Sequence, residues 1–204
     1  THPACGLPGG ISKPLSEENR QEIAQMAASC KNFAQFTLKL FHNLVLDNAK
    51  YVGLIKSQAY TMPTYYMGMV DENNKVNFYD GKIRVTDPEG REFIKFSSQD
   101  YLQHIGEHVE EWTYSKFPYL KAIGWKGQVA GADSGIYRVG PLGRLNVSAG
   151  MATPLAQEEY LQMYKTFGNK PVHSTLAFHW ARLIELLYAT ERSMELVEDP
   201  EITS

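Results

Sequence analysis

Two long stretches of the sequence, one in each half, carry apolar residues at intervals of three and four positions. This spacing places the apolar side chains on one face of an α-helix. The sequence therefore predicts two long amphipathic helices, the first with a break near Asp47-Asn48 and a short continuation to Ile55. The apolar positions are Ile23, Met26, Cys30, Phe33, Phe36, Leu40, Phe41, Leu44 and Val45 in the first helix, and Leu176, Trp180, Leu183, Leu187, Met194 and Val197 in the second.

The middle of the chain has a different pattern, because short runs of β-branched and aromatic residues alternate with turn sequences. Asp80-Gly81 and Asp87-Pro88-Glu89-Gly90 are two of these turn signals. Runs and turns at this spacing are typical of antiparallel hairpins. The sequence predicts a small meander with strands at Tyr65–Val70, Val76–Tyr79, Lys82–Val85 and Phe93–Phe96.

After the meander, Ser97 or Ser98 is expected to cap a helix that reaches Trp112, and residues 115–148 are expected to be irregular. Pro154 opens a further helix to Phe167, which should lie beside the final helix because Gly168 and Pro171 interrupt the chain between them. The predicted fold class is α+β, mainly α with a small antiparallel β insertion. A single domain covers residues 1–204: helical over 15–56, a β meander over 62–97, and helical or irregular over 98–204.

Composition describes an ordinary globular protein. The 204 residues are 43% hydrophobic and 21% charged, with a net charge of -3. This charge gives no reason to expect nucleic acid, which favours basic patches. No apolar run approaches the ~20 residues of a membrane-spanning helix, so no membrane span is expected. No secretory signal is visible, and a cytoplasmic location is predicted.

Two cysteines, Cys5 and Cys30, are the whole thiol content, and no CxxC motif occurs. Their scarcity fits a reducing compartment, and each is expected to be a free thiol that packs as a small apolar residue. Two distant thiols cannot supply a metal centre that needs four thiolate ligands. The sequence therefore predicts no metal ligands in this chain.

The block Tyr137–Asn146 (YRVGPLGRLN), with Thr153–Ala156 (TPLA) and His173–Ile202 after it, carries a family resemblance. With His2-Pro3 and Pro8-Gly9-Gly10, these motifs resemble the middle of a nickel–iron hydrogenase large subunit, of the soluble cytoplasmic type that is NAD-linked or reduces methyl viologen. The resemblance implies the long-helix bundle core of the large-subunit fold. It also implies that the chain is an internal fragment of a longer protein.

The resemblance further implies a function for the parent protein, an oxidoreductase that oxidises hydrogen reversibly at a nickel–iron centre. Its expected partners are an iron–sulfur small subunit, together with NAD-reducing or other electron-transfer subunits. The paired cysteine motifs that hold nickel and iron in this family are absent here. The chain is therefore expected to be a scaffold portion that binds no cofactor and is inactive in isolation. The electron acceptor and the oligomeric state are left open.

Two other functions remain open. The quinone-site subunit of a complex I-type assembly has the same fold without the metal cysteines, so loss of the motifs is an alternative to truncation. A helical interaction module whose motifs match by accident is the third possibility. The apolar seams of the two long helices also predict that the isolated chain self-associates, because large exposed apolar surfaces favour association.

Among single residues, His2 is the one functional candidate, a proton relay or partner contact placed by the resemblance. His104 and His108 have the i, i+4 spacing of a helical metal pair, but rim histidines beside Glu107, Glu110 and Glu111 are the favoured interpretation. His173 and His179 are expected to serve packing and surface hydrogen bonds.

Two further motifs concern binding of anions and of carboxylates. The segment Gly6–Gly10 lacks the strand, helix and Gly-Lys-Ser/Thr context of a phosphate loop, and Pro8 removes a backbone donor. It is therefore expected to be a packing loop. Arg138 and Arg144 are expected to tie the irregular segment to the helices through carboxylates such as Glu185 or Glu191.

Overall fold

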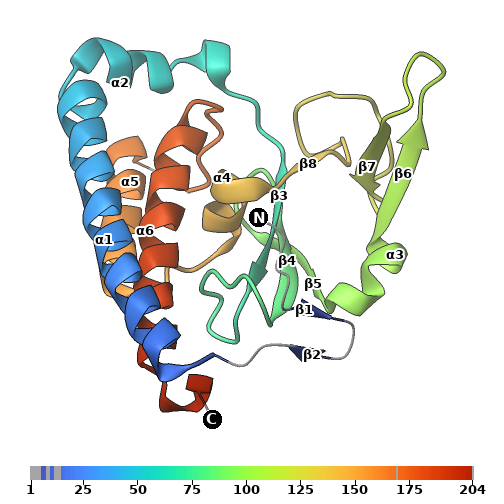
Figure 1. The fold of residues 1–204 in the computed structure, drawn as a ribbon. Helices are drawn as coiled ribbons and strands as arrows, with labels where there is room; N and C mark the ends of the chain where they lie inside the picture. The colour runs from blue at the N-terminus through green and yellow to red at the C-terminus, as the bar shows by residue number, and fades with distance from the viewer. Residues whose placement is uncertain (1–5, 8–9, 12–14, 169, 204) are drawn as a thin grey trace.

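The computed structural model describes residues 6–7, 10–11, 15–168 and 170–203. Three long helices form one side of the molecule, a four-stranded sheet with a short helix against it forms the middle, and a β-hairpin forms the other side (Figure 1). The mixed α and β class is confirmed. No helix in the described part of the chain is long and apolar enough to cross a membrane.

The elements follow in chain order as β1 (Gly6–Leu7), β2 (Gly10–Ile11), α1 (Glu17–Phe41), a π-helical turn (His42–Leu46), α2 (Ala49–Ile55), β3 (Tyr65–Val70), β4 (Lys82–Thr86), β5 (Glu92–Phe96), α3 (Tyr101–His104), β6 (Ile105–Val109), β7 (Lys116–Leu120), β8 (Tyr137–Arg138), α4 (Gly140–Val147), α5 (Pro154–Phe167) and α6 (Ala177–Glu198). Short 3-10 turns lie at 58–60, 98–100 and 200–203.

Helix α1 begins where the sequence predicts, because the Ser16 hydroxyl accepts a hydrogen bond from the Asn19 amide at 3.2 Å. It gives way to the π-helical turn after Phe41, and Asn48 caps α2. The predicted break and continuation to Ile55 are therefore confirmed.

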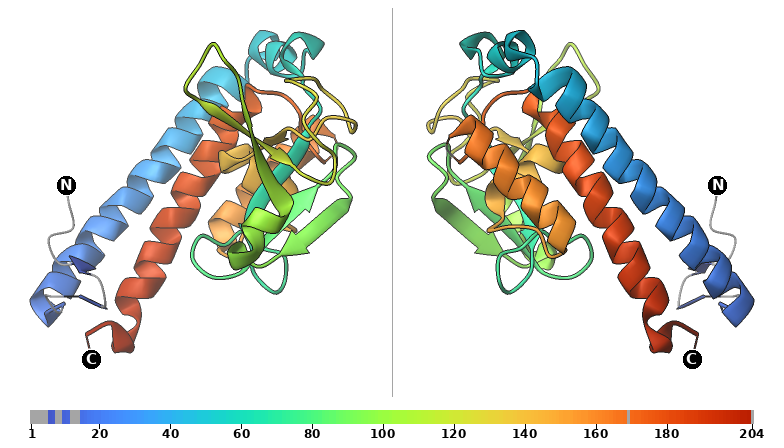
Figure 2. Two further views of the ribbon diagram at one scale, coloured as in Figure 1. Left: turned by 90° about the vertical axis from the view of Figure 1, so that its right-hand side faces the viewer. Right: turned by 90° about the vertical axis from the view of Figure 1, so that its left-hand side faces the viewer.

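The face of α1 that packs against α6 differs from the expected one. Ala27, Ala34 and Leu38 are the buried residues of α1. The larger apolar residues lie on the outer face, where Met26 and Phe33 are 60% and 61% exposed. Alanine side chains let two helix backbones approach closely, so α6 packs on the small residues and leaves most of the predicted apolar positions in solvent, although Phe41 contacts Trp180. Figure 2 shows α1 and α6 side by side along the edge of the molecule.

The sheet has the order β5-β4-β3-β8, with β3, β4 and β5 antiparallel and β8 parallel to β3. The prediction of a fourth meander strand at Val76–Tyr79 is wrong. Two hydrogen-bonded turns occupy this stretch instead: Asp71 accepts from the Asn73 and Lys75 amides, and Asn77 accepts from the Tyr79 amide. Such side-chain bonds compete with strand pairing.

The predicted helix through Trp112 is also wrong. Helix α3 ends at His104, and Ile105–Val109 forms strand β6, which pairs with β7 in a hairpin that projects from the body (Figure 1). Gly106 allows this pairing, because a Cβ atom there would lie 2.7 Å from the Tyr119 ring. The segment predicted to be irregular thus contains β7, β8 and α4.

The main core lies between the helices and α4. Helices α5 and α6 are neighbours as predicted, and their contact buries Ala156, Met163, Trp180 and Ile184. A second cluster under the sheet contains Tyr65, Val85, Phe96 and Leu120. Helix α4 lies between the sheet and the helices and holds the two parts together.

Helix α4 crosses the sheet at a glycine. A Cβ atom at Gly143 would lie 2.8 Å from the Arg138 carbonyl oxygen and 3.3 Å from that of Met67. We expect Gly143→Ala to lower the free energy of unfolding by about 1–3 kcal/mol, because backbone atoms cannot yield as a flexible side chain can. Denaturant unfolding measures this. Gly53→Ala in α2, where a Cβ meets nothing within 4 Å, is the control and should not destabilise the protein. Equal stability of both variants would contradict the close approach.

Candidate functional site

A buried polar centre lies where α4 meets the segment that leads into α6. Asn146 is 1% exposed. Its Nδ2 donates to the Val172 carbonyl at 2.9 Å, and its Oδ1 accepts from the Val172 amide at 3.0 Å and from the Tyr164 hydroxyl at 2.8 Å. One side chain thereby satisfies both backbone groups of Val172, which fixes the segment in place.

His173 follows directly and connects this segment to the sheet. Its Nε2 lies 2.9 Å from the Pro88 carbonyl oxygen and its Nδ1 lies 2.9 Å from the Tyr66 hydroxyl of β3. Arg138 of β8 donates from its guanidinium to the His173 carbonyl at 2.9 Å. We call Tyr66, Arg138, Asn146 and His173 the polar hub, because they join three separate parts of the chain.

The protonation of His173 follows from its partners. The Pro88 carbonyl can only accept, so Nε2 carries a hydrogen. Burial lowers the pKa of His173 below its ordinary value. The hydrogen bond to the Pro88 carbonyl raises this pKa again, and the positive charge of Arg138 lowers it further. The ring is therefore neutral at pH 7 with Nδ1 as an acceptor, and the single hydrogen of the Tyr66 hydroxyl is shared between Nδ1 and the Val172 carbonyl oxygen, which lies 3.0 Å from the hydroxyl. Because both nitrogens are engaged, neither is free to bind a metal ion.

Tyr66 of the hub and its neighbour Tyr65 in β3 are protonated at neutral pH. Burial raises the pKa of Tyr66 to about 12. Burial, followed by the carboxylate of Asp87, raises the pKa of the neighbouring Tyr65, whose hydroxyl donates to the Ala132 carbonyl at 2.9 Å. Neither phenol is poised to transfer a proton near pH 7.

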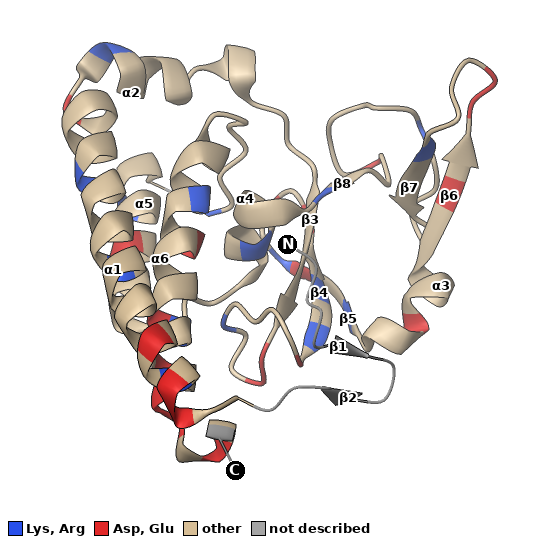
Figure 3. Ribbon diagram, in the orientation of Figure 1, with Lys and Arg blue, Asp and Glu red and all other residues tan. Residues whose placement is uncertain are grey.

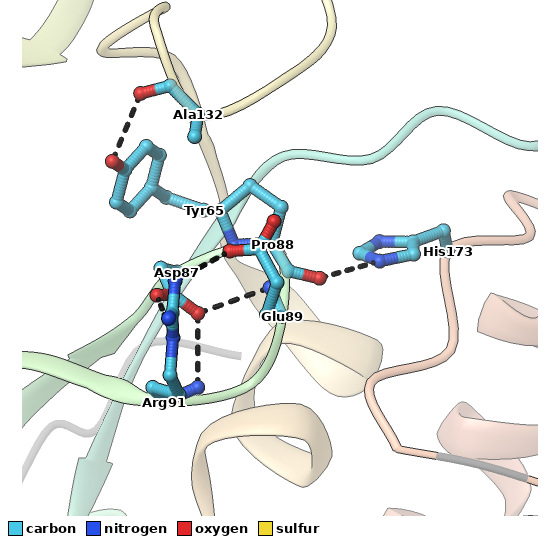
Figure 4. A network of polar contacts seen from close by, with 7 residues as sticks. All are labelled: Tyr65, Asp87, Pro88, Glu89, Arg91, Ala132 and His173. Atoms are coloured by element: carbon cyan, nitrogen blue, oxygen red, sulfur yellow. Dashed lines mark hydrogen bonds and ion pairs between the residues drawn. The ribbon is translucent and has the colours of Figure 1, made fainter.

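The turn that presents Pro88 to His173 is held by Asp87 (Figure 4). Its carboxylate accepts from the Glu89 and Arg91 amides at 3.0 and 2.9 Å and from the Arg91 guanidinium at 2.8 Å. This aspartate turn is the one that the sequence predicted between β4 and β5. It places a carbonyl oxygen within reach of the imidazole, from a different part of the chain (Figure 4).

Two buried carboxylates of α6 tie α4 and α5 to the bundle. Glu185 accepts from Arg144 Nε and Nη2 at 2.6 and 2.7 Å, which confirms the predicted arginine–carboxylate pair. Glu191 accepts from the Thr153 hydroxyl and the Leu155 and Ala156 amides at the start of α5. Glu191 therefore caps a helix and Arg138 donates to a backbone carbonyl, and within the described part of the chain neither forms an arginine–carboxylate pair.

Lys170 has a partly buried side-chain amine that is held by neutral groups. Its ammonium donates to the Ser148 carbonyl at the end of α4 and to the Tyr160 hydroxyl, and lies 5.1 Å from the ring centres of Tyr160 and Tyr164. Burial, with a smaller contribution from Arg84, lowers the pKa of Lys170 to about 7. Helix carbonyls and aromatic faces replace water around this amine.

Two small cavities flank the polar hub. One of about 280 Å³ is lined by side chains that include Thr64, Trp125 and Arg138, and another of about 350 Å³ by Lys56, Pro171 and His173, among others. Within the described residues no three His, Cys, Asp or Glu side chains gather closely enough to hold a metal ion. The arrangement around the hub is thus suited to fixing the chain, and it brings together no nucleophile and base.

The other sequence candidates do not converge on the hub. His104 ends α3 and packs against Phe96 with 4.3 Å between ring centres, whereas His108 lies in β6 and stacks on Trp125. They do not share a helix face, so the helical metal pair is excluded. His108 lies 2.9 Å from Glu110, as the rim interpretation expected. His179 is exposed on α6.

His2, Cys5 and Pro8-Gly9 lie outside the described residues. Cys30 is free but exposed on α1, which corrects its expected burial. Sequence reasoning missed Tyr66, Asn146 and Lys170. Asn146 had a visible signal, since it ends the motif block Tyr137–Asn146. The other two had none, because their partners are remote in sequence.

No family model matches the chain. Over 203 residues, all of this chain, it is 44% identical to the iron–sulfur subunit of the F420-non-reducing hydrogenase of Archaeoglobus profundus, spanning 42% of that protein. It is 42% identical to the vhu-type F420-non-reducing hydrogenase subunit of Methanococcus voltae, spanning 45% of it. It is 35% identical to the beta subunit of the NAD-reducing hydrogenase HoxS of Cupriavidus necator, spanning 40% of it.

A solved structure has the same fold. A chain of the NAD+-reducing [NiFe]-hydrogenase in the H2-reduced state superposes with a TM-score of 0.84 and 31% identity, over 97% of this chain and 42% of that one. The name describes the whole complex and assigns no metal to the matched chain. The present chain spans less than half the length of the relatives it matches.

The Archaeoglobus relative corrects the expectation of a large subunit. That protein, 44% identical across the whole chain, is called an iron–sulfur subunit. Its name contradicts the large subunit and the nickel–iron centre that were expected for the parent protein, and the large-subunit fold is not supported. None of these three relatives is named as a quinone-site subunit, so that alternative is not supported either.

The residues of this chain do not fit an iron–sulfur cluster. Such clusters are held by four cysteine thiolates, or by two cysteines and two histidines. The sequence has two cysteines, and Cys30 is exposed on α1 with no second cysteine among the described residues. The described residues therefore do not provide the ligands of a cluster, since no three His, Cys, Asp or Glu side chains gather among them.

Proposed function

We propose that the chain belongs to the hydrogenase family of these relatives and is a scaffold segment of an iron–sulfur subunit. Such a subunit takes part in electron transfer within a multi-subunit oxidoreductase. The observation that carries the proposal is the 44% identity over the full chain to a protein of that name. The common fold with a chain of a solved hydrogenase supports it. More than half of each relative lies outside the matched region, and the cluster ligands are expected there.

The polar hub defines what the segment contributes in this proposal. Arg138, Asn146 and His173 fix the sheet to the helices through hydrogen bonds to backbone groups, and Arg144 and Glu185 add a buried ion pair. Such a network holds two layers in one relative position, which an electron-transfer subunit needs because transfer depends on fixed distances between centres. We also propose that the subunit contacts further hydrogenase subunits and passes electrons to a soluble acceptor. The relatives' names differ in the acceptor, so it is left open.

The chain by itself is expected to bind neither nickel nor iron stoichiometrically and to show no hydrogen uptake with viologen dyes. The reason is the number of ligands, since two distant thiols cannot form a four-thiolate centre. Metal analysis after anaerobic purification and dialysis measures this. Stoichiometric iron that disappears in a Cys5→Ala, Cys30→Ala variant would contradict it.

The hydrogenase role is tested by tagging the gene product in the organism that encodes it and purifying it without oxygen. We expect viologen-dependent hydrogen oxidation to co-purify with the tag, together with iron–sulfur signals in electron paramagnetic resonance. An Arg144→Met variant should lower the recovered activity, whereas Lys116→Met, which removes an exposed ion pair, should not. A tagged protein that purifies without hydrogenase activity and without iron would overturn the proposal.

A further inference from the structure

The smaller of the two cavities beside the polar hub has walls from four parts of the chain. They are the segment that leads into β3, strand β7, the loop between β7 and β8, and β8 itself (Figure 1). We call it the Arg138 cavity. Its volume of about 280 Å³ has room for on the order of nine non-hydrogen atoms, since a water molecule occupies about 30 Å³. Pro118 and Gln128, which are exposed, also line it, so a solute can enter from the solvent.

A buried hydroxyl group in the wall of the Arg138 cavity lacks a partner. Thr64 is 1% exposed, and its Oγ1 makes no hydrogen bond within the described residues. The hydroxyl of Tyr66 is near that of Thr64, but its hydrogen is shared between the Val172 carbonyl and His173 Nδ1. Tyr66 therefore has no hydrogen to give Thr64. A buried polar group without a partner is uncommon in folded proteins and indicates a polar group bound beside it.

The Arg138 cavity also contains a cation without a counter-ion. Of the described residues that line it, Arg138 alone is charged. Its Nη1 donates to the His173 carbonyl at 2.9 Å, and no ion pair in the described part of the chain includes it. Acidic residues gather where α1 begins and α6 ends, away from β8 (Figure 3). Because a guanidinium carries five N–H groups, donors remain for an anion, and the partly buried charge favours one.

The rest of the wall is largely aromatic. Phe117, Trp125 and Tyr137 line the Arg138 cavity beside its two polar side chains. The Trp125 ring stacks on that of His108 with 4.7 Å between ring centres, and its centre lies 5.5 Å from that of Phe117. These contacts hold the indole in place before a ligand arrives, which lowers the entropic cost of binding. Aromatic side chains favour a ligand with a flat apolar body.

We propose that the Arg138 cavity binds a small aromatic carboxylate. The planar guanidinium of Arg138 matches the two oxygens of a carboxylate, and the Thr64 hydroxyl can donate to the same group. The ring of the ligand then lies among the aromatic residues. A phosphate dianion would bring two negative charges to a single cation, and a neutral ring would leave that cation without a counter-ion. The site does not depend on the proposed role in electron transfer.

A titration of sodium benzoate into the ¹⁵N-labelled full chain, followed by nuclear magnetic resonance, tests the proposal. We expect a saturable shift of the Trp125 indole N–H signal, identified by its loss in Trp125→Phe. The expected dissociation constant is on the order of 1 mM, because the ligand is small. Benzamide has nearly the same shape without the charge and should bind about tenfold more weakly or worse. Equal binding of the two compounds, or no shift with benzoate, would overturn the proposal.

Conservative variants separate the binding site from the fold. Thr64→Val removes a hydroxyl that has no partner in the described chain, so it should weaken benzoate binding about tenfold without lowering the unfolding midpoint. Thr86→Val is the matched control, because its hydroxyl is also buried and unpartnered but does not line the cavity, and it should bind normally. Arg138→Lys keeps the charge but loses the planar fork, and should bind at least as weakly as Thr64→Val. Unchanged binding in Thr64→Val or in Arg138→Lys would refute the site.

The tagged gene product, purified as described above, distinguishes a free ligand from a carboxylate of the protein itself. Benzoate at about 20 mM should raise its Tm, because a ligand that binds the folded state stabilises it, and benzamide at the same concentration should raise it less. If benzoate binds the 204-residue chain but has no effect on the gene product, a side chain of the protein fills the cavity and the proposal of a free ligand is wrong.

Discussion

Replacing Arg144 by methionine is expected to lower the free energy of unfolding by about 3–5 kcal/mol, the cost of leaving a buried carboxylate without its partner. Glu185 is 8% exposed, and both of its oxygens accept from Arg144. The Arg144 guanidinium also lies 4.8 Å from the centre of the Phe78 ring. Denaturant unfolding at pH 7 measures the loss.

Two further variants separate the charge effect from the loss of packing. The double variant Arg144→Met, Glu185→Leu should recover most of the stability, because it removes the unpaired charge as well. Lys116→Met breaks an ion pair whose side chains are 59% and 57% exposed, and should change stability by about 0.5 kcal/mol or less. A loss below about 1 kcal/mol in the Arg144→Met variant would mean that the Glu185 carboxylate is hydrated.

The stability of the protein is expected to rise between pH 7 and pH 9 by roughly 2–3 kcal/mol through Lys170. The pKa of Lys170 is about 7 in the folded protein and returns to about 10.5, its ordinary value, on unfolding. Between these values the unfolded chain binds the additional proton. Stability is therefore gained as the pH rises through this window and lost as it falls towards 7. Denaturant unfolding at a series of pH values measures the slope, and Lys170→Met should abolish it.

The pH range in which stability rises must end below about pH 10. Tyr66 and Tyr160 have pKa values raised to about 12, so above pH 10 the folded protein binds more protons than the unfolded chain and stability falls again. Lys165→Met, which changes an exposed lysine of α5, should leave the slope between pH 7 and 9 intact. A slope that persists in Lys170→Met would contradict the assignment to this amine.

Features that depend on neighbours in sequence were predicted well. The Ser16 cap, the break before α2, the turn at Asp87 and the start of α5 at Pro154 all rest on contacts within a few residues. A pairing of Arg144 with a carboxylate of the helices, Glu185 or Glu191, was also predicted, and the structure selects Glu185. Periodicity alone was insufficient for Ile105–Val109, where apolar spacing suggested a helix and pairing with β7 forms a strand.

The sequence by itself thus determined where the two long helices run, since helical hydrogen bonds and caps are local. It also excluded a four-thiolate metal centre built from this segment alone, because the sequence contains two cysteines. Only the tertiary structure decided which seam of α1 is buried, since that choice depends on how closely α6 can approach Ala27 and Ala34. It likewise assembled Tyr66, Asn146, Lys170 and His173, whose partners are remote in sequence. The low pKa of Lys170 exists only because folding removes water from a site that no local pattern marks.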